Sequence, residues 1–124
     1  MDFRIQRVLT LMSSDLHREL SLEELARTVN LTPEHLCRLF KAGTGESPLK
    51  YRKRLRIQKA RELLETTFLS VKEIMFAVGV NDASHFVRDF EAAYGLSPTQ
   101  YRAHFQSLYL SGAAAVTPEI KIGQ

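Results

Sequence analysis

An internal repeat is the sequence feature that most constrains how this chain can fold. Residues 45–52 read GESPLKYR and residues 95–102 read GLSPTQYR, so Gly, Ser, Pro, Tyr and Arg recur in the same order and spacing. The repeat extends backwards, because residues 21–45 align with residues 70–95 when one extra residue is allowed in the second copy. The chain is therefore predicted to contain two copies of one supersecondary unit.

The first helix of each copy is bounded by residues that cap helices. A serine followed three residues later by a glutamate is the pattern of a capping box at a helix start. A residue that tolerates the left-handed backbone region then ends the helix. The first copy has Ser21, Glu24 and Asn30 at these positions, and the second copy has Ser70, Glu73 and Gly79.

Two more helix starts follow in each copy. Short polar side chains cap helix N-termini, and proline at the first helical position loses no hydrogen bond. The candidates are Thr32 with Pro33, Asn81 or Asp82, Ser47 with Pro48, and Ser97 with Pro98. Each copy is thus predicted to be a helix-turn-helix followed by a supporting helix.

Apolar spacing predicts an all-α fold of about seven helices, because no segment alternates as a strand would. A first helix carries Ile5, Val8, Leu9, Met12 and Leu16. The helix at about 48–65 is apolar on two faces, with Leu49, Ile57, Ala60 and Leu64 on one and Tyr51 and Leu55 nearly opposite. Such a helix can pack against both copies and connect them as two helix-turn-helix subdomains.

These signals predict one bipartite domain over residues 1–110. It consists of a first helix-turn-helix lobe at 1–46, a linker helix at 47–65 and a second lobe at 66–110. Residues 111–124 contain small residues and a proline, and are predicted to form a flexible tail.

Positive charge is concentrated in the linker helix. The net charge of the chain is +3, yet residues 47–61 contain seven Lys and Arg residues and no acidic residue. A basic band on an otherwise mildly acidic chain favours a polyanionic partner such as nucleic acid. Charge alone leaves open the alternative that the band is a solvated helix face.

The second helix of each copy is predicted to expose a polar stripe. If the apolar positions face a core, positions 34, 37, 38 and 41 point outward, as do positions 84, 87, 88 and 91. A recognition helix in the DNA major groove needs a few donors and small groups on one face. The helices at about 33–43 and 83–94 are therefore candidate recognition helices.

The length of the linker helix supports the same hypothesis. Eighteen helical residues span about 27 Å, and successive major-groove faces on one side of DNA lie about 34 Å apart. One monomer is therefore predicted to place its two recognition helices in adjacent major grooves.

The second copy carries the signature of a known family. Residues 71–102, VKEIMFAVGVNDASHFVRDFEAAYGLSPTQYR, closely resemble the signature of AraC/XylS-type transcriptional regulators, and the similarity covers about residues 3–108. The resemblance implies a seven-helix, sequence-specific double-stranded DNA-binding domain. Family members activate, or sometimes repress, bacterial promoters, and activators typically contact RNA polymerase. Many members have a separate effector-binding or dimerisation domain before this one. Both a stand-alone regulator and a piece of a longer protein remain open.

The resemblance also implies which residues read bases. Carried over position by position, these are Glu34, Cys37 and Arg38 in the first copy and Ser84, His85 and Arg88 in the second. His35 matches His85 and is a further candidate, although capping or packing would also explain either histidine. Asp82, Asp89 and Glu91 make the second recognition helix acidic, so the first copy is expected to hold DNA more firmly.

Phosphate contacts are expected from cations beside these helices. The candidates are Lys41, Lys50, Arg52, Arg54 and Arg102. The two arginines of the GxSPxxYR repeat, Arg52 and Arg102, follow helix N-termini, which themselves bind anions.

Other functional classes have less support. The sequence has no Gly-rich phosphate loop and no plausible acid–base pair, so an enzyme is not expected. Its four histidines and single cysteine lack metal-ligand spacing, so neither metal nor cofactor is expected. The single cysteine and the absence of a long apolar segment favour a cytoplasmic protein with no membrane partner. The resemblance to DNA-binding regulators implies association with the nucleoid. The main alternative function is a helical adaptor that binds protein partners.

Overall fold

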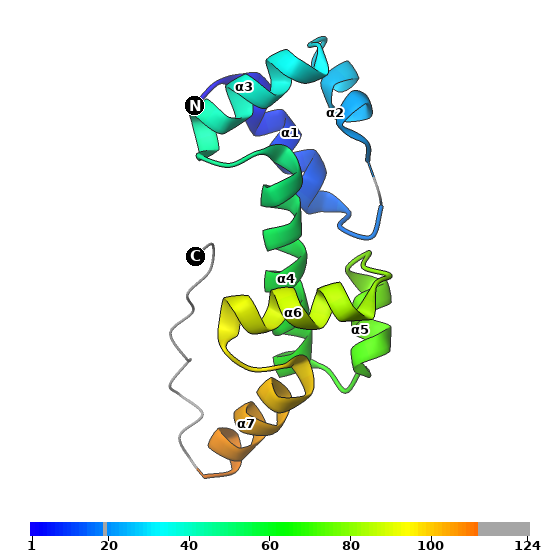
Figure 1. Cartoon of the computed structure of the whole chain (residues 1–124), viewed down its shortest axis with the longest axis vertical. Coiled ribbons are helices and arrows are strands. Elements are labelled where there is room, and N and C mark those ends of the chain that lie inside the picture. The colour runs from blue at the N-terminus through cyan, green and yellow to red at the C-terminus, as the bar shows by residue number, and fades with distance from the viewer. Residues whose placement is uncertain (19, 112–124) are drawn as a thin grey trace. The chain divides into compact units, whose positions relative to one another are not determined.

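The computed structural model describes residues 1–18 and 20–111, and in them it contains seven helices and no strand (Figure 1). The helices are α1 (Phe3–Ser14), α2 (Leu22–Thr28), α3 (Pro33–Thr44), α4 (Pro48–Thr66), α5 (Val71–Ala77), α6 (Ala83–Tyr94) and α7 (Pro98–Leu110). The all-α prediction is confirmed. The predicted tail at 111–124 lies, apart from Ser111, outside the described residues.

The chain divides into two compact units, Met1–Leu55 and Arg56–Gln124, here called the N-terminal and C-terminal units. The boundary falls inside α4, which runs without a break from one unit into the other. The N-terminal unit contains α1, α2 and α3, and the C-terminal unit contains α5, α6 and α7 (Figure 1). Each unit has the helix-turn-helix predicted for one copy of the repeat.

The core of the N-terminal unit is built from α1, α2 and α3. Its fully buried side chains include Ile5, Leu25, Leu36 and Phe40. The ring of Tyr51, at the start of α4, packs edge-on against Phe40 with 5.5 Å between ring centroids. The first half of α4 thus completes this core, as the apolar pattern predicted. Helix α1 ends at Ser14, however, so Leu16, the last apolar residue assigned to this helix from the sequence, lies beyond it.

The core of the C-terminal unit contains a cluster of aromatic rings. Phe90 is fully buried, and its ring lies 6.1 Å from Phe86, 4.8 Å from Tyr94 and 5.6 Å from Tyr101. Ile57, Ala60 and Leu64, from the second half of α4, are buried in the same cluster. The predicted apolar face of α4 is therefore correct at these three positions. It is wrong at Leu49, which is 53% exposed, although Pro48 beside it is fully buried and Tyr51 packs on the N-terminal core.

The predicted helix boundaries are largely correct. Asn30 and Gly79 have positive φ values of 57° and 80° at the ends of α2 and α5. Ser70 and Glu73 form the reciprocal capping box, with Glu73 N donating to Ser70 Oγ and Ser70 N donating to Glu73 Oε1. In the first copy Glu24 N donates to Ser21 Oγ, but the hydroxyl donates to the Glu24 carboxylate at 3.2 Å. In this copy the Glu24 carboxylate therefore accepts from the Ser21 hydroxyl, whereas the predicted capping box has it accept from the Ser21 backbone N–H.

A partly buried polar group ties α7 to α4 in the C-terminal unit. The Tyr101 hydroxyl donates to Glu65 Oε2, which also accepts from Arg61 Nη1 at 3.1 Å. Burial, together with the Glu65 carboxylate, raises the pKa of Tyr101 to about 12. Burial likewise raises the pKa of Tyr94.

We expect this raised pKa to make the C-terminal unit lose stability between about pH 10 and pH 12. An unfolded tyrosine ionises near pH 10, so the folded state holds the Tyr101 proton more tightly and is favoured below that pH. The stabilisation is then lost as the pH rises through about 12. Tyrosinate absorbance and urea unfolding across this range provide the measurement. Tyr101→Phe should flatten the pH dependence, and an unchanged profile in that variant would contradict the assignment.

Candidate nucleic-acid interface

Helix α3 presents the predicted polar stripe. Glu34, Arg38 and Lys41 are exposed, while His35 and Cys37 are half-buried. The opposite face of α3 is fixed by Leu36 and Phe40, which are fully buried in the N-terminal core. Because side chains three and four apart share a helix face, the exposed residues form one continuous stripe. The Thr32 hydroxyl, which accepts from His35 N at 3.2 Å, caps the helix as predicted.

Helix α6 presents a matching stripe on the C-terminal unit. Ser84, His85, Arg88 and Glu91 are exposed, and Val87 is half-buried. Phe86 and Phe90 face the core. Arg38 and Arg88 thus occupy the same position in the two helices. The structure therefore presents each predicted set of base-reading residues on one helix of its own unit.

The cap of α6 is the second of the two candidates that the sequence offered. Asp82 Oδ1 accepts from His85 N at 3.0 Å, and Asp82 Oδ2 lies 3.2 Å from His85 Nδ1. The pKa of Asp82 is lowered, chiefly by the hydrogen bond from His85 N. The carboxylate is therefore ionised beside the candidate reading residue.

The predicted phosphate contacts fall into two groups. Lys41 and Lys50 are exposed, on α3 and on the first turn of α4. Arg54 is half-buried, with Nε 3.3 Å from Glu46 Oε2 and its guanidinium 4.7 Å from the centroid of the Tyr51 ring. The structure thus gives Arg54 an intramolecular role, in which it ties α4 to the loop after α3.

Arg102 has a different role from the predicted phosphate contact. Its guanidinium donates to three backbone carbonyls, those of Leu64 and Thr67 at 3.2 Å and of Leu69 at 2.5 Å. These carbonyls belong to the last turn of α4 and to the loop that enters α5. Three of the five guanidinium N–H donors are thus used within the unit.

Arg52 has the equivalent role in the N-terminal unit. Its Nη1 donates to the carbonyl of Leu20, which immediately precedes the cap residue of α2. Leu69 precedes the cap residue of α5 in the same way. The arginine of each GxSPxxYR segment therefore fixes the entry to the first helix of its own helix-turn-helix. The recurrence of an arginine in both copies, beside buried Pro and packed Tyr positions, is the sequence signal that indicates this role.

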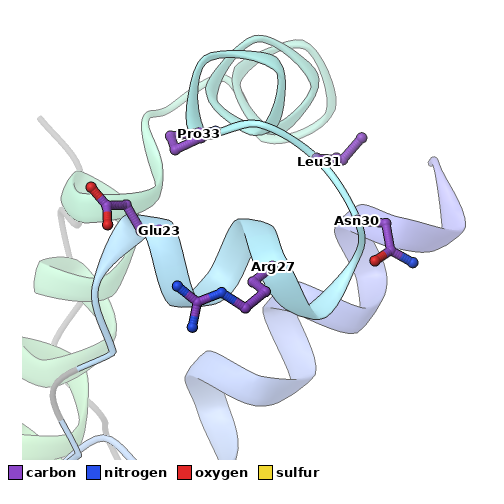
Figure 2. Close-up of a pocket in the computed structure, with 5 residues that line it drawn as sticks. All are labelled: Glu23, Arg27, Asn30, Leu31 and Pro33. Carbon is purple, nitrogen blue, oxygen red and sulfur yellow. The ribbon is translucent and has the colours of Figure 1, made fainter.

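A surface hollow of about 450 Å³ lies beside the turn of the first helix-turn-helix (Figure 2). Glu23 and Arg27 reach it from α2, Asn30 and Leu31 from the turn, and Pro33 from the start of α3. Its residues are thus distinct from the α3 stripe. Within residues 1–18 and 20–111, no cluster of His, Cys, Asp and Glu side chains is placed to hold a metal ion. None of the described helices has the length and apolar character needed to cross a membrane.

Comparisons with known proteins identify the family. A family model described as a helix-turn-helix domain matches residues 25–104. The MmsAB operon regulatory protein of Pseudomonas aeruginosa is 40% identical over 91 residues, which are 73% of this chain and 30% of that protein. The chain therefore spans about a third of the length of this curated relative.

Two solved structures share the fold. The DNA-binding domain of AdpA, a global transcriptional factor solved in complex with a target DNA, is 27% identical with a TM-score of 0.81, over 86% of this chain and 96% of that one. A regulator with an AraC-type DNA-binding domain from Chromobacterium violaceum is 31% identical with a TM-score of 0.76, over 82% of this chain and 90% of that one. This chain belongs to the AraC-type helix-turn-helix family of transcriptional regulators.

Proposed function

We propose that this chain is the DNA-binding part of a bacterial transcriptional regulator and that α3 and α6 read double-stranded DNA. The observation that carries the proposal is the pair of matched exposed stripes, each with an arginine at the same helical position. The similarity to the AdpA domain, which was solved with its target DNA, supports the same function. The exposed Arg, Lys and Ser side chains of the two stripes are hydrogen-bond donors of the kind that contact base edges and phosphates.

Arg38 and Arg88 are the proposed principal base readers. A guanidinium can donate two hydrogen bonds to O6 and N7 of guanine, the commonest specific contact in the major groove. Glu34 can accept from a cytosine amino group, and Cys37 offers a small apolar surface to a thymine methyl group. His35, Ser84 and His85 are the remaining candidates.

Lys41 and Lys50 are the proposed phosphate contacts, because both are exposed near α3. Arg52, Arg54 and Arg102 support the interface from within their units, since each has intramolecular partners. Helix α3 is expected to bind more strongly than α6, because Lys41 in α3 is matched by Glu91 in α6.

Entry of α3 and α6 into adjacent major grooves remains part of the proposal, and it predicts two sequence boxes about one helical turn apart. Promoter activation, contact with RNA polymerase and an additional effector-binding or dimerisation domain are also proposals, because they rest on the family alone. Action at the nucleoid, in the cytoplasm, is a proposal on the same ground.

We expect Arg38→Ala to weaken binding to a specific duplex about 5- to 150-fold, because a good bidentate contact contributes about 1–3 kcal/mol of discrimination. Fluorescence anisotropy on a duplex carrying a selected site provides the measurement. Arg7→Ala is the matched control, since Arg7 is an exposed arginine on α1, outside both stripes. Equal losses in the two variants would mean that Arg38 supplies only general charge.

Salt dependence separates DNA binding from a protein-adaptor function. Each neutralised phosphate contributes about −0.9 to the slope of log affinity against log salt. Lys41→Ala should therefore make the slope shallower by about one. A wild-type slope near zero would contradict DNA binding and favour the adaptor.

A further inference from the structure

The carboxylate of Asp82 holds His85 at two points. Oδ1 accepts from the backbone N–H of His85 at 3.0 Å, and Oδ2 lies 3.2 Å from ring atom Nδ1. Both side chains remain open to solvent, with 63% of His85 and 54% of Asp82 exposed. The imidazole ring is therefore oriented by its helix cap while it stays available to a partner.

The N-terminal unit lacks this arrangement, although it has a histidine at the same position. His35 follows Thr32, whose hydroxyl accepts from the His35 backbone N–H at 3.2 Å. A hydroxyl group can donate or accept, so it does not select which ring nitrogen carries the proton. The two reading helices therefore differ in the charge beside their histidine.

The charge of Asp82 favours one tautomer of the ring beside it. A lowered pKa, caused first by the His85 backbone hydrogen bond, keeps the Asp82 carboxylate ionised. An ionised carboxylate only accepts hydrogen bonds, so it favours a proton on Nδ1 of the ring beside it. In a neutral imidazole the other nitrogen, Nε2, is then an acceptor.

We propose that Asp82 is a specificity-determining residue, which makes His85 an acceptor that selects an adenine or a cytosine, rather than a guanine or a thymine, on the strand it faces. Only these two bases present an amino group in the major groove, at N6 of adenine and N4 of cytosine. Guanine and thymine present acceptors there, and an Nε2 without a proton cannot donate to them. This inference rests on the proposed DNA-reading role of α6.

The Asp82→Asn variant tests the inference while preserving the helix cap, because Asn caps helices as well as Asp does. The amide oxygen can still accept from His85 N, and the amide nitrogen then faces the ring as a donor. The donor favours an unprotonated Nδ1 and moves the proton to Nε2. The inference thus predicts that His85 changes from an acceptor to a donor.

Nitrogen-15 NMR of the imidazole shows which ring nitrogen carries the proton, and it needs no DNA. The measurement is made at about pH 8, where an ordinary histidine is neutral. We expect His85 to carry its proton on Nδ1 in the wild type and on Nε2 in Asp82→Asn. The same ring tautomer in both proteins would overturn the inference, whatever the protein does with DNA.

Selection of bound duplexes from a random pool at the same pH tests the consequence. At one position of the box read by α6, the wild type should prefer adenine or cytosine. Asp82→Asn should shift that position by about tenfold towards guanine or thymine, with the other box unchanged. In a His85→Ala background the Asp82→Asn change should have no effect on base preference.

Three results would count against the inference. An unchanged preference in Asp82→Asn, or a preference that survives His85→Ala, would assign the position to another residue. A wild-type preference for guanine would mean that a protonated ring donates from Nε2. If the wild type enriches no sequence, the proposed function fails, whereas a two-box motif without the predicted shift refutes only this inference.

Discussion

Phe90→Ala is expected to unfold most of the C-terminal unit while the N-terminal unit stays folded. Phe90 is fully buried and contacts the rings of Phe86, Tyr94 and Tyr101. Truncating a buried phenylalanine costs about 3–5 kcal/mol, through lost apolar burial and the cavity left behind. That cost is comparable with the total stability of a unit this small, at roughly 0.05–0.15 kcal/mol per residue.

Amide hydrogen exchange followed by NMR measures this effect unit by unit. Protection of the α5, α6 and α7 amides should collapse, while α1 and α3 amides, whose core contains Phe40 instead, keep theirs. Phe68→Ala is the matched control in the same unit, because Phe68 is 99% exposed and its loss should be nearly neutral. Loss of protection in both units together would contradict the separation of the two cores.

Arg102→Ala should destabilise the C-terminal unit by about 2–4 kcal/mol. The substitution removes a charged donor from three carbonyls, at Leu64, Thr67 and Leu69, that join the end of α4 to the entry of α5. Leaving partly buried acceptors without donors costs more than the hydrogen bonds themselves contribute. Urea unfolding, monitored by C-terminal-unit amide signals, provides the measurement.

Arg88→Ala is the matched control, because this arginine is exposed on α6 of the same unit. It should change stability by less than about 0.5 kcal/mol. Arg102→Lys should recover only part of the loss. A lysine ammonium is a compact charge, whereas the planar guanidinium holds its N–H donors in fixed directions toward all three carbonyls. If Arg102→Ala were as stable as the wild type but bound DNA with a shallower salt slope, the original phosphate assignment would be right.

The features that depend on local chemistry were predictable from the sequence. Caps such as Thr32 and Ser70 act within three residues, and the left-handed positions at Asn30 and Gly79 end their helices as expected. The reading stripes followed in the same way, because burial of Leu36 and Phe40 determines which side of α3 is exposed. Helical periodicity alone is therefore enough to predict the buried and exposed faces of these helices.

The features that depend on distant contacts were predicted less well. Arg52 and Arg102 were assigned to phosphate because of their charge, yet their partners lie 32 to 38 residues away in sequence. Leu49 matched the apolar face of α4 but is exposed, although Pro48 next to it is fully buried. The Asp82–His85 arrangement is local, but the sequence left two caps possible, and only Asp82 brings a charge to the ring.

Selection of bound sequences from a random duplex pool at moderate salt tests the central claim, that α3 and α6 both read DNA. Wild type, Arg38→Ala and Arg88→Ala should be selected in parallel. The account predicts a motif of two boxes about one helical turn apart, with each variant relaxing one box and leaving the other intact. A single box insensitive to Arg88→Ala would contradict the reading role of α6, and no enrichment would contradict DNA reading altogether.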